Sequence, residues 1–331
     1  MIEKVSYRGW PNAYRLSNEV VELIVLADVG PRVISYKFVG DENQFYEIED
    51  HAGLTGGVQF RLYGGHRLWV SPEGPSTYYP DNEPATVSQD ADTITFASPV
   101  EKDPPGRHLL KELEIRLAPT GSRAVVTHRV TNTGPTPIEF APWGPTMMRG
   151  GGRGIMPLPP RVMMDDDHLL PVGQFALWSY TDLGDPRWRL GTEYIQLIHD
   201  SRPQGKFKEQ MGGVFTPCGW VAYYRRGHLF VKHAAVVDGA RYPDLGCNVE
   251  LFTNADFLEV ETLAPLTKVE SGRHATHVDH AQIRISARIF RINLQNTPEG
   301  SLGLLEIVGA KRTLPGFEDA LWVGVNPTGF Y

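Results

Sequence analysis

Hydrophobic and polar side chains alternate strictly along several short segments of the chain. Leucine and isoleucine alternate with charged residues over 112–117, and isoleucine and alanine alternate with arginine and serine over 283–289. A period of two is typical of a β-strand that buries one face. Turn residues at 119–122 follow the first segment, and a mostly apolar run at 124–130 follows the turn, which together predict a hairpin.

Two further strand pairs are expected, and the pattern contains little helical periodicity. The pairs join 20–26 to 32–38 and 219–224 to 228–231. The best helical candidate is a short segment at 317–322. Many short strands separated by turns predict an all-β sandwich with few short helices.

One irregular stretch, residues 148–160, is rich in glycine and proline. We interpret it as a surface loop, with a lid or an anion-binding loop as the alternative. It lacks the lysine and the following serine or threonine of a phosphate-binding loop, so nucleotide binding is not expected.

Length and charge limit the class of protein. The chain has 331 residues and a net charge of −7, and it contains no internal repeat or low-complexity linker, so we expect a single domain over 1–331. The negative net charge argues against nucleic acid as the main partner, because phosphate binding needs a basic face, but it leaves open a local basic patch for a small anion. No apolar run is long enough to span a membrane, and residues 1–5 do not resemble a signal peptide. We therefore expect a cytoplasmic protein with neither nucleic acid nor membrane as a partner.

The segment 63–73 combines two glycines with residues that suit sugar recognition. His66, Arg67, Trp69 and Glu73 follow the glycines closely. Aromatic rings pack on the C–H face of a sugar, and charged groups bind its hydroxyls. The glycines are expected to let the backbone approach a ligand.

A second segment, 77–82, continues this pattern with Tyr79 and Asp81. We interpret both segments as parts of a carbohydrate site. The alternative is an aromatic core strand that ends in a polar turn.

A third group of candidates follows the predicted hairpin at 219–231. Lys232 and His233 end its second strand, and Tyr242 and Asp244 lie in the loop beyond. Consecutive residues of a regular strand point to opposite faces, so only one of Lys232 and His233 is expected to reach a ligand.

The fourth candidate segment carries two carboxylates among apolar neighbours. Glu259 and Glu261 share one face of a strand at 257–263. They are either pocket carboxylates that act as a general base or hydroxyl acceptor, or members of a solvated outer face.

Three histidines, His274, His277 and His280, are spaced three residues apart. Positions three apart in a strand alternate faces, so the side chains do not converge on one metal ion. No metal and no cofactor are expected.

Several segments together resemble the galactose mutarotase-like superfamily, and most closely a bacterial family of unassigned activity within it. The resemblance covers roughly residues 15–290, and its specificity lies in the order and spacing of the segments. These segments are Gly-Pro-Arg-Val at 30–33, Gly-Gly-His-Arg-Leu-Trp at 64–69, Thr-Asn-Thr-Gly at 131–134, Ala-Pro-Trp at 141–143, Gly-Trp at 219–220, and the run 242–266.

The resemblance implies a β-supersandwich with a carbohydrate groove on a concave sheet. In aldose 1-epimerases of this superfamily a glutamate removes the proton of the anomeric hydroxyl while a histidine protonates the ring oxygen. Glu261 stands in Glu-Thr-Leu, where the resemblance places the catalytic glutamate. The histidine motif has no counterpart, because residues 141–146 read Ala-Pro-Trp-Gly-Pro-Thr.

Two functions remain open at this point. The chain is either an aldose 1-epimerase-like isomerase or a carbohydrate-binding protein without catalysis, and its partner in both cases is a small carbohydrate. As an enzyme it would use Glu261 as the base and His66 as the acid, with His233 in reserve. We expect one groove to be lined by His66, Arg67, Tyr79, Lys232, Asp244 and Glu261.

Overall fold

The computed structural model describes residues 1–102, 107–202 and 208–285. Within these ranges the chain forms strands and only two short 3-10 helices, η1 (Glu49–His51) and η2 (Pro75–Tyr78). The all-β expectation is therefore confirmed. The helical candidate at 317–322 and the end of the expected strand at 283–289 lie outside the described residues.

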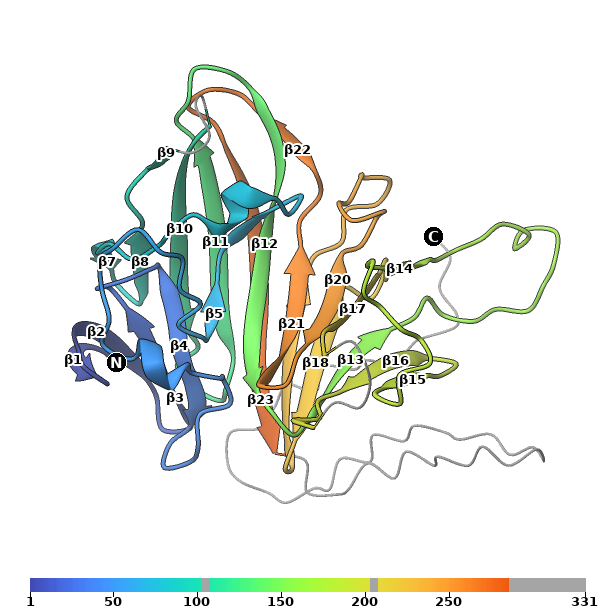
Figure 1. Cartoon of the computed structure of the whole chain (residues 1–331), viewed down its shortest axis with the longest axis horizontal. Coiled ribbons are helices and arrows are strands. Elements are labelled where there is room, and N and C mark those ends of the chain that lie inside the picture. The colour runs from blue at the N-terminus through green and yellow to red at the C-terminus, as the bar shows by residue number, and fades with distance from the viewer. Residues whose placement is uncertain (103–106, 203–207, 286–331) are drawn as a thin grey trace. The chain divides into compact units, whose positions relative to one another are not determined.

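The first of two antiparallel sheets contains twelve of the described strands (Figure 1). Its main path runs, in spatial order, through β1 (Ile2–Tyr7), β2 (Trp10–Ser17), β3 (Val21–Leu26), β4 (Arg32–Phe38), β5 (His66–Arg67), β12 (Ile138–Arg149), β21 (Phe257–Leu263), β20 (Val249–Thr253), β17 (Gln210–Val214) and β14 (Phe175–Leu177). β6 (Trp69–Ser71) and β22 (Thr267–Val269) also pair with β12.

The second sheet contains the other eleven described strands. Its main path runs through β15 (Trp188–Leu190), β16 (Tyr194–Ile198), β13 (Arg153–Pro157), β18 (Trp220–Arg225), β19 (His228–Ala234), β23 (His274–Ile285), β11 (Ala124–Asn132), β10 (His108–Leu117), β8 (Thr93–Ala97) and β7 (Thr86–Asp90). β9 (Glu101–Lys102) pairs with β10.

The sequence alternation explains how these sheets pack. Leu113 and Ile115 on β10 are fully buried while their charged neighbours remain partly exposed. They belong to one hydrophobic cluster that also contains Val33 and Val260 of the first sheet and Phe230 of the second. Each such side chain stabilises the fold by about 1.5–3 kcal/mol through burial. The two sheets therefore pack face to face over a shared core.

The predicted strand pairs are confirmed in register. Leu117 pairs with Ala124 across the first hairpin, and Arg225 pairs with His228 across the second. β3 and β4 pair as expected. The described strands lie in the unit Met1–Ser286, and a single domain over 1–331 stays a prediction. No helix in the described ranges is long and apolar enough to cross a membrane.

The interpretation of residues 148–160 as a surface loop is wrong for most of that stretch. β12 continues to Arg149, and β13 begins at Arg153 and carries the chain into the other sheet. Met148, Met156 and Pro157 are buried. The glycines form the tight connection between the sheets, and because β13 pairs with β16 and β18 its polar backbone is satisfied.

Candidate functional site

Alternation along β21 divides its side chains between two faces of the first sheet. Leu258 and Val260 pack in the core between the sheets, and Thr262 points the same way, to Asp279 of β23. Glu259 and Glu261 therefore point to the opposite side. We call that side the Glu261 face; it carries Glu250, Glu259 and Glu261.

Glu261 is almost completely buried, with an exposed fraction of 1%. Trp143 of β12 donates its indole N–H to the Glu261 carboxylate at 2.6 Å. Burial and the nearby Glu259 carboxylate raise the pKa of Glu261 well above its usual value, while the Trp143 hydrogen bond acts in the opposite direction. A carboxylate in this setting is a candidate general base.

Glu259 has a cationic partner. The Arg67 guanidinium lies 3.1 Å from its carboxylate and also stacks on Trp69, 3.8 Å from the ring centroid. Burial raises the pKa of Glu259, and the attraction of Arg67 limits that rise. Glu259 is therefore a buried residue that forms an ion pair, and it does not belong to a solvated outer face.

A third carboxylate, Glu250 of β20, lies directly opposite Glu261 in the strand pairing. It is fully buried, and no N–H or hydroxyl donor among the described residues reaches its carboxylate oxygens. Its hydrogen-bond neighbour is the Asp244 carboxyl group. Burial, together with the Glu261 and Asp244 carboxylates, raises the pKa of Glu250 well above its usual value. Glu250 therefore has neither a cation, such as the one that pairs with Glu259, nor an N–H donor, such as the one that binds Glu261.

Aromatic side chains surround these carboxylates. Trp69 and Trp143 meet edge to face, with ring centroids 5.2 Å apart. They pack in one cluster with the buried residues Met211 and Leu263 and the half-buried residues Phe60, Leu62, Trp178, Tyr180 and Phe252. Apolar ring faces beside buried acceptors form a surface that suits a sugar, whose C–H groups and hydroxyls need both.

Two further predicted residues lie near this face. The Ser71 hydroxyl donates to the Asp244 carboxylate at 3.1 Å, and Asp244 is an electrostatic neighbour of Glu250. Glu73 is exposed, accepts a hydrogen bond from the Tyr78 hydroxyl, and contributes to the raised pKa of Glu250. The structure therefore brings Arg67, Trp69, Glu73, Asp244 and Glu261 together.

Three predicted residues have other contacts. Asp81 forms an ion pair with the buried Arg32 at 2.6 Å. Tyr242 is buried, and its hydroxyl accepts a hydrogen bond from the Val237 backbone N–H at 2.9 Å. Tyr79 is half-buried at the C-terminal end of η2. The contacts of Asp81 and Tyr242 are those of structural residues.

His66 does not lie on the Glu261 face, which corrects the expectation that the two residues line one groove. It pairs with the core residue Val33 on β4 and with Thr146 on β12. Its Nδ1 lies 2.8 Å from the Thr146 hydroxyl, between the sheets. Because side chains alternate along β5, His66 points inward and Arg67 points to the Glu261 face.

The two glycines before His66 also serve a different purpose from the one expected. Both have left-handed backbones, with φ of +113° at Gly64 and +72° at Gly65. A Cβ at Gly65 would lie 2.2 Å from the Val33 carbonyl oxygen. The glycines therefore permit close approach to neighbouring backbone, not to a ligand.

The positions of Lys232 and His233 also contradict the expectation that one of them reaches the same groove as Glu261. Lys232 is buried between the sheets, where its ammonium group lies 3.3 Å from the Asp279 carboxylate. His233 is exposed on the other side of β19, and its ring lies beside that of His280. Neither reaches the Glu261 face, because β19 belongs to the second sheet.

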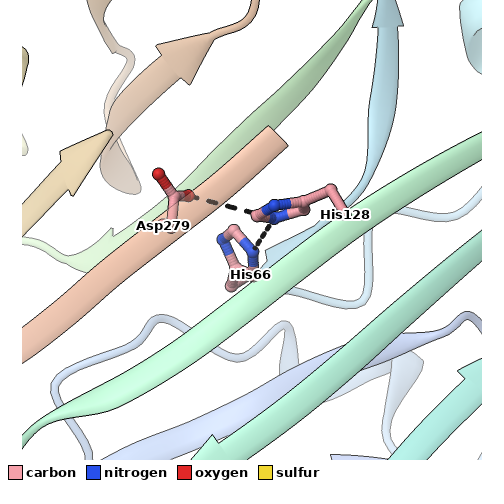
Figure 2. A group of neighbouring side chains, drawn as sticks. All are labelled: His66, His128 and Asp279. Atoms are coloured by element: carbon pink, nitrogen blue, oxygen red, sulfur yellow. Dashed lines mark hydrogen bonds and ion pairs between the residues drawn. The ribbon is translucent and has the colours of Figure 1, made fainter. Parts of the chain in front are cut away.

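The buried polar residues between the sheets form what we call the inter-sheet cluster. Figure 2 shows three of them, with His66 and Asp279 directed at His128. His66 Nε2 lies 2.7 Å from His128 Nε2, and His277 Nε2 lies 2.9 Å from the Thr262 hydroxyl. The cluster consists of His66, His128, Lys232, His277 and Asp279, with Thr146 and Thr262.

The donors and acceptors of His66 and His128 match when both rings are neutral, and the remaining Asp279 oxygen, Oδ2, forms an ion pair with Lys232. His128 Nδ1 donates to the His277 carbonyl, so His128 Nε2 accepts from His66 Nε2–H. Burial lowers the pKa of His128 to about 3 and that of His66 well below its usual value. Burial alone would raise the pKa of Asp279, but Lys232 and His277 outweigh it and hold that pKa well below its usual range.

Three atoms of this cluster are close enough together to hold a metal ion. The ligand atoms of His66, His128 and Asp279 lie within 4.8 Å of one another. A metal ion there would break the bond between the two imidazoles and would place positive charge beside the Lys232 ammonium. The arrangement therefore favours a cluster held together by its hydrogen bonds and by the Lys232–Asp279 ion pair.

The three histidines spaced three residues apart separate as expected. His277 lies in the inter-sheet cluster. On the outer face of β23, the Arg123 guanidinium donates a hydrogen bond to His280 Nδ1 at 3.0 Å. His274 is exposed.

Sequence reasoning missed several residues of both regions. Glu250 is a lone carboxylate in an apolar strand, which is the same signal that marked Glu259 and Glu261. Trp143 stands in the segment where the histidine motif was sought. No local pattern marks Trp178, Tyr180 or His128, because tertiary packing alone brings them to their positions.

Comparison with known proteins agrees with the fold. No family model matches the chain, and no curated protein matches it in sequence. Its structure is similar to a galactose mutarotase-like protein from Lactobacillus casei, with 11% identity over 82% of this chain and 100% of that chain and a TM-score of 0.56. It is also similar to a Klebsiella pneumoniae protein provisionally named as an aldose 1-epimerase, with 12% identity, coverage of 86% and 84%, and a TM-score of 0.59.

A third similar structure is a provisionally named mutarotase from Salmonella typhimurium, with 11% identity, coverage of 83% and 90%, and a TM-score of 0.51. These likenesses show that the chain has the galactose mutarotase-like fold, a sandwich of two antiparallel sheets. The predicted fold class is confirmed, and the resemblance is confirmed as far as the fold.

Proposed function

We propose that the protein binds a small carbohydrate on the Glu261 face and interconverts its anomers, with Glu261 as the general base. The observation that carries the proposal is the setting of Glu261: a buried carboxylate, held by the Trp143 N–H at 2.6 Å, beside apolar aromatic rings. The fold and its similarity to mutarotase-like structures support the same class of ligand. A cytoplasmic location, suggested by composition, is part of the proposal.

The reaction requires two proton transfers in each direction and the breaking and re-forming of one C–O bond. Glu261 removes the proton of the anomeric hydroxyl, the bond between the anomeric carbon and the ring oxygen breaks, and the ring oxygen gains a proton. Rotation of the carbonyl end and closure on its other face give the second anomer. Because Glu261 is almost fully buried, a sugar reaches it only if neighbouring half-buried side chains such as Trp178 and Tyr180 move.

A second candidate function is carbohydrate binding without catalysis. It is favoured by the position of His66, which lies between the sheets and not on the Glu261 face. In that case Glu261 accepts a hydrogen bond from a sugar hydroxyl and does not act as a base.

Anomer exchange measured by NMR separates the two functions. Freshly dissolved monosaccharides, sugar phosphates and uronic acids are each followed with wild type, Glu261→Gln and the control Glu19→Gln, in which an exposed glutamate is changed. We expect wild type and the control to accelerate exchange of at least one sugar, and Glu261→Gln to lose on the order of a hundred-fold or more of that rate.

Binding is measured in parallel by thermal shift, since a ligand that binds the folded state raises its stability. A wild type that is stabilised by a sugar but accelerates no exchange supports the binding function instead. Full activity in Glu261→Gln would refute the assignment of the base.

A further inference from the structure

The strand register places a second carboxyl group beside the proposed base. Glu250 and Glu261 are directly paired residues of adjacent antiparallel strands, so their Cβ atoms lie roughly 4.5–5.5 Å apart. On the other side of Glu250, β17 presents Gly213, where an added Cβ would lie 2.8 Å from the Glu250 Cγ. Because Gly213 has no side chain, the Glu250 side chain can occupy the space beside it.

The surroundings of Glu250 leave its charge uncompensated. Arg67 neutralises Glu259, and Trp143 donates to Glu261, but no described N–H or hydroxyl donor reaches Glu250, whose hydrogen-bond neighbour is the Asp244 carboxyl group. Its electrostatic neighbours include the Glu261, Asp244 and Glu73 carboxylates. A fully buried carboxylate with like-charged neighbours and no donor is strongly unfavourable, and a bound proton removes the cost. The raised pKa values of Glu250 and Glu261 agree with this argument.

We propose that Glu250 and its carboxylate neighbours Glu261 and Asp244 share one proton at neutral pH, and that Glu250 is the acid that protonates the sugar ring oxygen. The inference rests on the proposed function, and it supplies the acid that the sequence lacks at 141–146. The anomeric hydroxyl and the ring oxygen are bonded to the same carbon, so a base and an acid from neighbouring strands reach both.

The proton balance closes over one cycle. The Glu261 carboxylate takes the proton of the anomeric hydroxyl as the bond to the ring oxygen breaks, and the Glu250 carboxylic acid gives its proton to that oxygen. After rotation, Glu250 takes the hydroxyl proton back, the ring closes on the other face of the carbonyl, and Glu261 returns its proton to the carbonyl oxygen. The sugar leaves as the other anomer, and the carboxyl pair regains its starting state.

The first test concerns the shared proton and needs no activity. A folded state that binds a proton above the unfolded carboxyl pKa of about 4.3 loses stability as pH rises toward the folded-state pKa. We therefore expect the melting temperature of wild type to fall between pH 5 and pH 8. Glu250→Gln, which keeps the shape and removes the titration, should lose less over this range, and Glu19→Gln should follow wild type.

A second readout uses the unmodified protein. With ¹³C-labelled glutamate, the carboxyl carbons of wild type should include a resonance at pH 7 whose shift is that of a protonated acid, and Glu250→Gln should lack it. If every glutamate carboxyl resonance of wild type is that of an ionised group at pH 6, the inference is overturned.

The third test concerns catalysis. With a sugar that wild type converts, the rate should fall on the alkaline side as the pair loses its proton. Glu250→Gln should lose on the order of a hundred-fold in rate together with that alkaline limb. If Glu261→Gln is inactive while Glu250→Gln keeps the full rate and the same limb, the proposed function stands and this inference fails. A wild type inactive on every sugar refutes both catalytic roles, and the first two tests then decide the shared proton alone.

Discussion

Glu261 and Thr262 are neighbours in the chain, yet they belong to polar regions of opposite character. Thr262 joins the inter-sheet cluster, where Lys232 is paired with Asp279 and the imidazole nitrogens of His66 and His128 have partners. Glu261 joins a face where Glu250, Glu259, Asp244 and Glu73 contribute carboxylates, and where Arg67 is the cation that pairs with Glu259.

The difference lies in pairing rather than in burial. Both regions are buried and rich in titratable groups, but the inter-sheet cluster pairs the Asp279 carboxylate with Lys232, whereas Glu250 has no N–H or hydroxyl donor among the described residues. Buried charges that are fully paired hold a structure in one arrangement, whereas uncompensated groups with shifted pKa values are typical of functional sites. We therefore propose a structural role for the inter-sheet cluster and a functional role for the Glu261 face.

The largest effect that tests this contrast is the loss of the cation from the inter-sheet cluster. Lys232→Met leaves the Asp279 carboxylate buried without a counter-charge, and we expect it to lower the free energy of unfolding by about 3–5 kcal/mol at pH 7. Urea unfolding measures this value. The control Lys268→Met changes an exposed lysine and should alter it by less than about 0.5 kcal/mol.

The same variant has a defined pH dependence. The folded-state pKa of Asp279 is depressed, so its stabilisation is complete above the unfolded pKa of about 3.9 and is lost as pH falls through the folded-state value. The difference between wild type and Lys232→Met should therefore shrink below about pH 4. Adding Asp279→Asn to Lys232→Met should recover part of the loss at pH 7, and strictly additive effects would show that the two residues are not coupled.

A smaller effect is expected on the Glu261 face from Trp143→Phe. This change removes the indole donor but keeps an aromatic ring, and it should lower stability by about 1 kcal/mol. Because the hydrogen bond lowers the pKa of Glu261, its loss should raise that pKa further. The acidic limb of the pH–rate profile should then move to higher pH. An unchanged limb would mean that Glu261 is not the ionising base.

Local patterns in the sequence were sufficient to predict some of the strands. The alternation at 112–117 and the turn at 119–122 correspond to β10 and its hairpin with β11, because one buried face requires that period. The stretch at 148–160 was misread, since glycines that join two strands look the same in sequence as glycines in a loop.

Candidate residues were harder to place than strands. The pairing of β5 with β4 and β12 decides that His66 faces inward, and nothing near His66 in the sequence shows this pairing. Arg67 and Glu261 were expected together, and they do lie on the same face. There Arg67 forms an ion pair with Glu259, and Trp143 donates a hydrogen bond to Glu261. Glu250 shows that a carboxylate in an apolar strand is informative even without a recognised motif.

The most direct test of the account asks which buried region responds to a sugar. The indole N–H resonance of Trp143, assigned by comparison with Trp143→Phe, and the imidazole resonances of His66, His128 and His277 are recorded while a sugar that raises the melting temperature is added. We predict that the Trp143 resonance shifts with saturation and that the three imidazole resonances stay in place. Shifts confined to the imidazoles, with an unchanged Trp143 resonance, would contradict the assignment of the Glu261 face as the sugar site.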